Sequence, residues 1–316
     1  MAEFTMTILG SGSALPMHGR HPSAQLVQCD DFHCLIDCGE GTQERMIVAG
    51  IKPFKIKYIL ISHLHGDHVF GLPGLLSSFS HLKRTDPLTV FGPVGIRGLL
   101  ECIFGYTELN LTYPLTIVEK EATSLTSIFS EGNVEILTFP LDHRIACNGY
   151  LIREKVAHHN LDKAKIRNEN LSIGQIQSLK RGENISVNGN IVSYENYLCK
   201  PSSAISYAYC SDTRSDLRIA SWIKGVTVLY HETTFMNDMR EMADITGHST
   251  SGEAGMIASA AEVTCLITGH YSSRYKEVGS LVAEAGVHFR FVLEAVEGKK
   301  YNLRSLAKGL PDKAEG

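Results

Sequence analysis

The chain has 316 residues, of which 43% are hydrophobic and 20% are charged, a composition typical of a globular protein. Its 30 lysine and arginine residues against 34 aspartate and glutamate residues give a net charge of −4. This balance excludes a wholly basic nucleic-acid-binding surface. Any contact with nucleic acid would therefore depend on local basic patches or on bound metal ions. No apolar run reaches the roughly 18 residues of a membrane span, and the N-terminus lacks the features of a signal peptide; we therefore expect no membrane contact.

Eight cysteines are scattered along the chain without a Cys-x-x-Cys pair. Small secreted domains stabilised by disulfides carry a much denser cysteine pattern. We therefore expect reduced thiols that pack as small apolar groups, and a cytoplasmic protein.

Short apolar runs bounded by Gly, Pro or Asp predict strands, and stretches with helical spacing between them predict helices. The expected strands are 4–9, 23–27, 32–36, 58–61, 88–91, 134–139, 204–210, 226–230, 264–268 and 287–292, and the expected helices are 42–49, 73–80, 94–104, 251–261 and 273–285. Runs of strands with strand–helix alternation near both ends predict one α/β domain over 1–316, with mixed sheets in a sandwich covered by helices.

The segment 153–200 differs from its surroundings because it is polar and has little apolar periodicity. A loop of this length inside a compact domain is usually functional or disordered. It is either a flexible arm that holds a ligand outside the site or a surface excursion without a function. Its basic residues are Lys163, Lys165, Arg167, Lys180 and Arg181.

The most informative stretch is 58–68, where an apolar strand is followed by His63, His65, Asp67 and His68. Imidazole and carboxylate groups together suit zinc or a similar divalent ion. The spacing indicates a metal site rather than exposed histidines on a turn.

Three later residues could complete such a site, since each follows an apolar strand. They are His143, Asp212 and His270. Taken singly, each is typical of a capping or solvated side chain. A pair of metal ions about 3.5–4 Å apart would need ligands of this kind from distant strands, together with a bridging carboxylate.

Several motifs, in order, resemble those of the tRNase Z (ribonuclease Z) family, short form, in the metallo-β-lactamase superfamily. HLHGDH (63–68) names the superfamily. The family motifs are LIDCGEGTQ (35–43), LDHR (141–144), YCSDTR (209–214), HETT (231–234), TGHST (246–250) and TGHYSSRY (268–275). The resemblance implies the αβ/βα sandwich of that superfamily and extends from Gly10 to about residue 293.

The resemblance also implies a ligand set for two zinc ions per subunit, with manganese as a possible substitute. His63, His65 and His143 would hold one ion; Asp67, His68 and His270 would hold the other; Asp212 would bridge them. A metal-bound hydroxide would attack the phosphodiester after the discriminator nucleotide of a precursor tRNA and leave a 3′-hydroxyl. Asp67 would also accept a proton, and His248, with His231 and Glu232, would protonate the leaving oxygen.

By the same resemblance, the segment 153–200 is an exosite arm that grips the tRNA elbow through its basic residues, and the protein is a homodimer. Arg20 would lie near the RNA 3′ end. Two departures stand out. The arm lacks the Gly-Pro-rich stretch common in the family, and His18 and His21 replace a usual Lys and Asn.

Two other functions stay open at this stage. A phosphodiesterase of the same fold, acting on small phosphodiesters, would not need the arm. A non-catalytic RNA-binding module would tolerate loss of metal ligands, yet all seven candidates are present. A dinucleotide-binding loop at Gly10 and Gly12 is excluded because the third glycine is missing and Pro16 and Pro22 interrupt the required helix. The sequence does not separate endonucleolytic cleavage from 3′ trimming.

Overall fold

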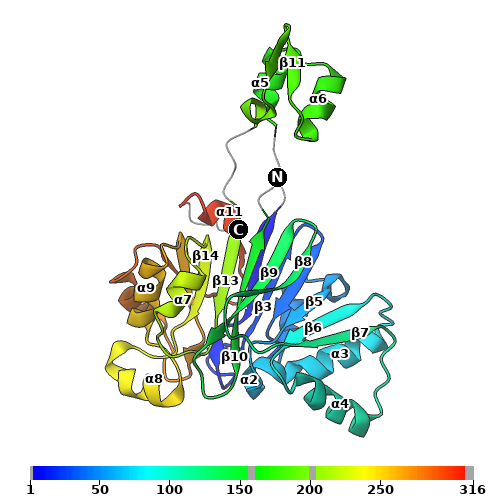
Figure 1. Cartoon of the computed structure of the whole chain (residues 1–316). Coiled ribbons are helices and arrows are strands. Elements are labelled where there is room, and N and C mark those ends of the chain that lie inside the picture. The colour runs from blue at the N-terminus through cyan, green and yellow to red at the C-terminus, as the bar shows by residue number, and fades with distance from the viewer. Residues whose placement is uncertain (1–2, 156–160, 199–203, 310–316) are drawn as a thin grey trace.

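Two seven-stranded sheets face each other within residues 3–155, 161–198 and 204–309, the part of the chain that the computed structural model describes (Figure 1). The first sheet has the order β18-β1-β3-β4-β5-β6-β7, antiparallel as far as β4 and parallel from β4 to β7. Its strands are β1 Phe4–Gly10, β3 Ala24–Cys29, β4 Phe32–Ile36, β5 Tyr58–Leu60, β6 Leu88–Gly92, β7 Leu115–Glu119 and β18 Lys300–Asn302.

The second sheet has the order β17-β15-β14-β13-β10-β9-β8. The strands from β8 to β13 pair antiparallel, and those from β13 to β17 pair parallel. Its strands are β8 Thr126–Glu131, β9 Val134–Leu141, β10 Cys147–Glu154, β13 Ser206–Cys210, β14 Val228–Glu232, β15 Cys265–Gly269 and β17 Val292–Glu294. A small parallel pair, β2 Gly12–Ser13 with β16 Tyr271–Ser272, joins the N-terminal region to the chain after β15.

Three apolar layers hold the sandwich together. Met6, Val27 and Tyr207 belong to the layer between the sheets. Helices α1 Thr42–Val48, α3 Gly71–His81 and α4 Ile96–Thr107 cover the first sheet. Helices α7 Arg218–Trp222, α9 Ser251–Ala260 and α10 Gly279–Gly286 cover the second. Strands apolar on both faces need such cover, since side chains alternate between faces. The predicted αβ/βα sandwich is confirmed.

Shorter helices connect these layers. They are α2 Gly66–Val69, α8 Arg240–Thr246, α11 Leu303–Leu306 and the 3₁₀ turns η1 Pro53–Lys55 and η3 Asn237–Met239. In the described residues, no helix combines the length and the apolar character needed to cross a bilayer.

Several sequence-based boundaries were wrong. The expected helix 273–285 begins only at Gly279, because the residues after β16 form a loop that contacts His18 and Arg20. Most of the expected strand 287–292 is irregular, and β17 starts at Val292. Strands β7, β8, β10 and β18 of the two large sheets were not predicted. The first two are edge strands that are half-exposed, so their apolar pattern is weak.

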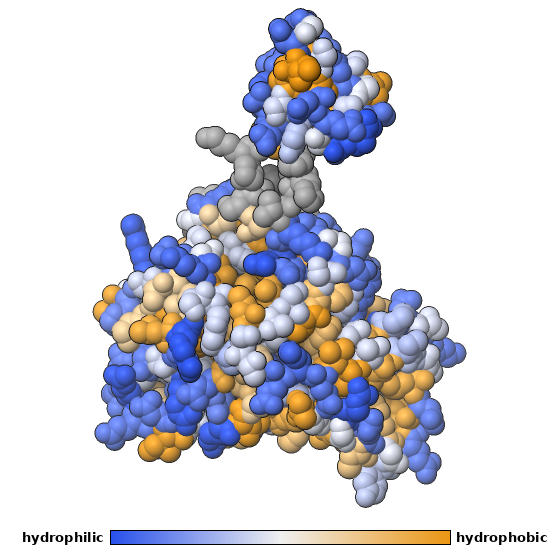
Figure 2. Space-filling view, viewed as in Figure 1, coloured by the Kyte–Doolittle hydropathy of each residue, from blue (hydrophilic) through white to orange (hydrophobic). Residues whose placement is uncertain are grey.

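The arm is folded where it is described, rather than a long loop. It contains α5 Lys163–Asn168, α6 Ile173–Lys180, the hairpin β11 Ile185–Val187 with β12 Asn190–Val192, and the 3₁₀ turn η2 Tyr194–Tyr197. Leu179, Ile185 and Tyr197 form its buried centre, and Ser172 starts α6 with a capping box. Residues 156–160 and 199–200 of the predicted arm lie outside the described residues. In Figure 1 and in the space-filling view of Figure 2, the arm projects beyond the end of the sheets where β10 finishes and β13 begins.

Candidate metal centre

The candidate ligands gather at one edge of the sandwich because strands from both sheets end there. His63 follows β5, Asp212 follows β13 and His270 follows β15. These strands run parallel to their neighbours, so the residues after them meet at the carboxyl edge. His143 lies in the turn between β9 and β10 at the same edge.

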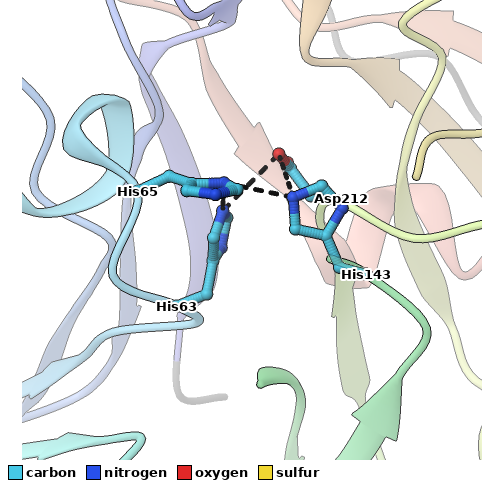
Figure 3. Close-up of side chains that lie close together, drawn as sticks. All are labelled: His63, His65, His143 and Asp212. Carbon is cyan, nitrogen blue, oxygen red and sulfur yellow. Dashed lines mark hydrogen bonds and ion pairs between the residues drawn. The ribbon is translucent and has the colours of Figure 1, made fainter. Parts of the chain in front are cut away.

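One group of side chains consists of His63, His65, His143 and Asp212 (Figure 3). His65 Nδ1 is 3.0 Å from His63 Nε2 and 3.1 Å from His143 Nε2. Asp212 Oδ2 lies 3.6 Å from His63 Nε2 and 3.8 Å from His143 Nε2. Four ligand atoms therefore converge on one point.

The second group consists of Asp67, His68 and His270, and Asp212 joins it to the first. Asp67 Oδ2 is 3.5 Å from both His68 Nε2 and His270 Nε2. The other oxygen of Asp212, Oδ1, lies 3.4 Å from His68 Nε2 and 3.2 Å from His270 Nε2. The two oxygens of Asp212 thus face different groups, which is the geometry of a bridging carboxylate.

Hydrogen bonds at Nδ1 orient four of these rings. His68 Nδ1 donates to Asp37 Oδ2 at 2.8 Å and His143 Nδ1 donates to the Gly247 carbonyl at 2.7 Å. His63 donates to Ser62 Oγ and His270 donates to Thr234 Oγ1, each at 3.0 Å. Each Nε2 is then left with a lone pair aimed into the cluster.

Whether a cation fits the cluster can be judged from the nitrogen atoms that point into it. His68 Nε2 and His270 Nε2 are buried and have no hydrogen-bond partner among the described residues. Buried polar atoms are rarely left unpaired. An imidazole and carboxylate donor set of this kind is what zinc prefers, so the residues fit a divalent metal ion.

Protonation favours the same use at the first group. Burial lowers the pKa of His63, His65 and His143, which keeps these rings in the neutral form that binds metals. At His68, burial alone would lower the pKa, but the carboxylates of Asp212, Asp67 and Asp37 raise it, so a bound cation would displace a proton there. Burial by itself would raise the pKa of Asp67, but His68 and His270 hold it well below its usual range. Asp67 is therefore a carboxylate at neutral pH.

Asp37 belongs to the LIDCGEGTQ motif (35–43), but it was not predicted as a site residue. It is fully buried and accepts hydrogen bonds from Ser62 N, His68 Nδ1 and Tyr209 Oη at 2.7–2.8 Å. Its position at the end of β4, opposite the end of β5, was the available signal. Gly39 follows closely, and a Cβ there would lie 2.4 Å from the Asp67 carbonyl, so only glycine lets these two loops meet.

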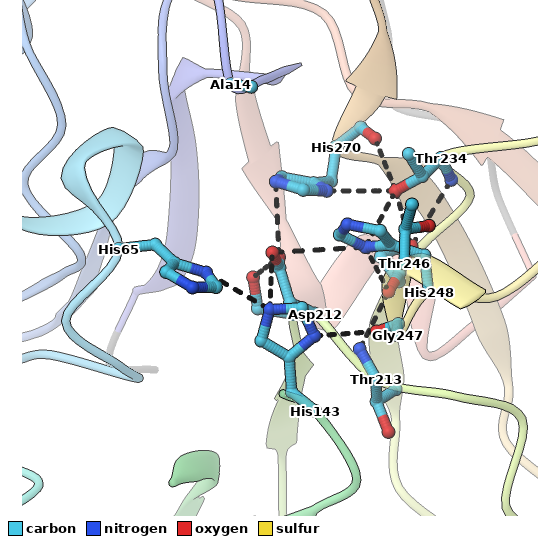
Figure 4. A network of polar contacts seen from close by, with 12 residues as sticks. Ala14, His65, His143, Asp212, Thr213, Thr234, Thr246, Gly247, His248 and His270 are labelled. Carbon is cyan, nitrogen blue, oxygen red and sulfur yellow. Dashed lines mark hydrogen bonds and ion pairs between the residues drawn. The ribbon is translucent and has the colours of Figure 1, made fainter. Parts of the chain in front are cut away.

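His248 and Glu232 form a buried pair beside the cluster. Figure 4 shows His248 next to Asp212 and His270. His248 Nδ1 is 3.0 Å from Glu232 Oε1 and 3.9 Å from Asp212 Oδ2. Glu232 also accepts from Thr213 N at 2.7 Å and from the Thr234 hydroxyl. Burial opposes a charge on His248, but Glu232 and Asp212 outweigh it and raise the pKa of His248 to about 9. A protonated imidazole therefore lies next to the candidate ligands.

His231, predicted as a partner of His248, lies apart from the cluster. It is fully buried, its Nδ1 donates to the Glu232 carbonyl at 2.7 Å, and burial lowers its pKa. Side chains alternate along β14, so His231 faces away from the side chain of Glu232. Within the described residues it makes no hydrogen bond or ion pair with a candidate ligand.

Arg20 is held by the protein itself. Its guanidinium donates to the carbonyls of Tyr275 and of Lys276, the latter at 3.1 Å. It thus fixes the loop after β16 beside the cluster, and its predicted contact with RNA stays a prediction.

The five basic arm residues differ in their surroundings. Arg181 is paired with Glu183 at 2.7 Å, and Lys165 donates to the Asn196 carbonyl at 3.0 Å. Lys163, Arg167 and Lys180 are exposed, and no ion pair to them occurs in the described residues. Only part of the predicted basic set is therefore free to meet phosphates.

Comparisons with known proteins decide the family. The chain is 40% identical over 301 residues to a protein named Ribonuclease Z from Cytophaga hutchinsonii, with 95% of this chain and 96% of the relative covered. The Ribonuclease Z of Porphyromonas gingivalis is 38% identical, with 96% and 100% covered. This chain belongs to the ribonuclease Z family. The resemblance inferred from its motifs is confirmed.

Other comparisons agree with the fold of the ribonuclease Z family. The crystal structure of human tRNase Z, short form, matches with a TM-score of 0.69 at 23% identity, covering 95% of this chain and 99% of that one. Residues 4–99 also match a family model described as anti-Pycsar protein Apyc1. This second match runs from β1 into the start of α4, and it leaves out β7 and β18 of the first sheet and the whole second sheet.

Proposed function

We propose that this protein is an endoribonuclease that removes 3′ trailers from precursor tRNA. The cut falls after the discriminator nucleotide and leaves a 3′-hydroxyl. The observation that carries the proposal is the pair of ligand groups joined by Asp212, with the His248–Glu232 pair beside it, in a chain of the ribonuclease Z family.

We infer that the cluster holds two zinc ions, for which manganese can substitute. His63, His65 and His143 would hold one ion, and Asp67, His68 and His270 would hold the other, with Asp212 shared between the two groups. When bound, such a pair polarises the scissile phosphate and lets water act as a nucleophile near neutral pH.

The chain's own groups then handle the protons. Asp67 is a carboxylate within the cluster, and by the family's pattern it would accept the proton of the attacking water. Protonated His248 has Nδ1 committed to Glu232, so its Nε2–H is the donor left for the departing 3′ oxygen. Glu232 is a positioning residue, since its own oxygens are occupied by Thr213, Thr234 and His248.

The arm and the cluster lie at opposite ends of β10, which supports a homodimer. β10 has 8 residues, a span of about 26 Å at 3.3 Å per residue. An RNA elbow held by one arm would therefore be presented to the cluster of the partner subunit. The apolar side chains of Ile47, Val48 and Phe70, which are 66–70% exposed around α1 and α2, are candidates for the subunit contact.

The homodimer is tested by measuring the mass in solution. Ile47→Glu should shift the protein toward monomer, whereas Val287→Glu, at an equally exposed apolar position on the end of α10, should not. We further infer a cytoplasmic location, which the free thiols of the described cysteines support.

The function is tested by comparing two substrates with one enzyme preparation. One is a precursor tRNA labelled in its 3′ trailer, and the other is bis(p-nitrophenyl) phosphate. Preferred turnover of the precursor with a single product end supports the proposal. Turnover of the small phosphodiester alone would favour a phosphodiesterase of the same fold.

A further inference from the structure

Glu297, in the connection between β17 and β18, is contacted by two distant parts of the chain, the segment 11–21 and helix α1. Its Oε1 accepts from His21 N at 2.7 Å and from Ser11 N at 3.1 Å, and its Oε2 accepts from His21 Nδ1 at 2.8 Å. Arg45 Nε on α1 lies 3.6 Å from Oε2. The Glu297 side chain is only 8% exposed.

The segment 11–21 that Glu297 holds is attached to the second ligand group at two points. Ala14 N donates to Asp67 Oδ2 at 2.9 Å, the same oxygen that faces His68 and His270. Ser11 O accepts from Tyr271 N at 2.9 Å, directly after His270. Figure 4 includes Ala14 and His270 in the same polar network.

The segment is short and strained, so it needs an external hold. Ala14 has a φ of 59°, in the left-handed region that residues other than glycine rarely adopt. The only strand that precedes Ala14 in this segment, β2, has two residues. Such a conformation persists only where the surroundings impose it.

We propose that Glu297 is a positioning residue for the metal ion held by Asp67, His68 and His270. It fixes Ser11 and His21, which fix the Ala14 amide on Asp67 and the backbone next to His270. The first group, His63, His65 and His143, makes no hydrogen bond or ion pair with the segment in the described residues, although His63 and His65 share the loop after β5 with Asp67. The proposal rests on the two-metal centre proposed above.

A carboxylate suits this position better than an amide. Its oxygens only accept, and the groups that face them are N–H and O–H donors of Ser11 and His21 together with the Arg45 guanidinium. Glu297→Gln would turn an NH2 group toward at least one of these donors. The segment would then lose part of its hold while the side chain keeps its size.

The test uses the full chain, stripped of metal and titrated with Co²⁺, with heat and visible absorption recorded. His270→Ala and His143→Ala assign the two binding steps. In Glu297→Gln, the step lost in His270→Ala should weaken by about 10–100-fold, the range for outer-shell changes. The step lost in His143→Ala should stay within about threefold of wild type.

The matched control is Glu154→Gln. Glu154 is also a buried carboxylate beside an arginine, Arg304, but it lies at the arm end of β10. Glu154→Gln should lower the melting temperature without weakening one Co²⁺ binding step more than the other. His21→Ala, at a 28% exposed side chain that folding should tolerate, should repeat the selective effect in weaker form.

Equal weakening of both steps in Glu297→Gln, or no change in either, would overturn the positioning role. A wild-type protein that binds fewer than two ions would instead refute the metal centre itself. The two failures are therefore distinguishable without any RNA substrate.

Discussion

His248 Nδ1 lies 3.0 Å from Glu232 Oε1, and both side chains are buried next to Asp212. This contact makes a histidine next to a candidate metal site an acid at neutral pH. Burial alone would have left the ring neutral, since it favours the uncharged form. The two carboxylates reverse that preference and raise the pKa of His248 to about 9.

Glu232→Gln should therefore move the alkaline limb of the cleavage rate to lower pH. His248 is protonated below its pKa, so activity that needs the proton is present below about pH 9 and is lost above it. Removing the adjacent charge should shift this limb down by about 1–3 pH units. The measurement is kcat against pH; an unmoved limb would remove Glu232 from this role.

Asp67→Ala should abolish cleavage and leave tRNA binding intact. The change removes a ligand oxygen and the proton acceptor, whereas the arm lies at the opposite end of β10. Cleavage assays and filter binding with the purified variant measure both properties. Substantial residual cleavage would show that Asp67 is not needed.

Replacing residues 155–204 with a short Gly-Ser linker should reduce turnover of precursor tRNA but not of the small phosphodiester. The arm has its own buried centre in Leu179, Ile185 and Tyr197, so its removal should spare the sandwich. Turnover of precursor tRNA should fall strongly, while hydrolysis of bis(p-nitrophenyl) phosphate should change little. If precursor turnover is unchanged, the arm does not bind the substrate.

Asp37→Asn should weaken both metal binding and the fold. The carboxylate accepts from Ser62, His68 and Tyr209 without contact with solvent. Losing such contacts costs about 1–3 kcal/mol of unfolding free energy, and metal affinity should fall about 10–100-fold. Asp31→Asn, at an exposed position before β4, is the control. Wild-type metal affinity in Asp37→Asn would contradict the role given to Asp37.

The seven candidate ligands could be predicted because each follows an apolar strand, and the structure brings them together. The residues that hold these ligands in place through hydrogen bonds could not be predicted. Glu297 stands 286 residues from Ser11, and no local pattern indicates that pairing. His231 shares a motif with Glu232, yet strand alternation turns its side chain away. In the arm, short helices and a two-strand hairpin bury too few apolar residues to leave a clear period.

If the protein is a two-metal ribonuclease, its cleavage of RNA must depend on the bound ions, and metal content and cleavage are best measured on the same sample. The purified protein is assayed for metal content and for cleavage of a precursor tRNA labelled in its 3′ trailer, before chelation, after chelation and after zinc or manganese is restored. We expect two ions per chain and one cut after the discriminator nucleotide, with cleavage lost when the metal is removed and regained when it is restored. Cleavage that survives complete metal removal, or two bound ions with no RNA cleavage, would contradict this expectation.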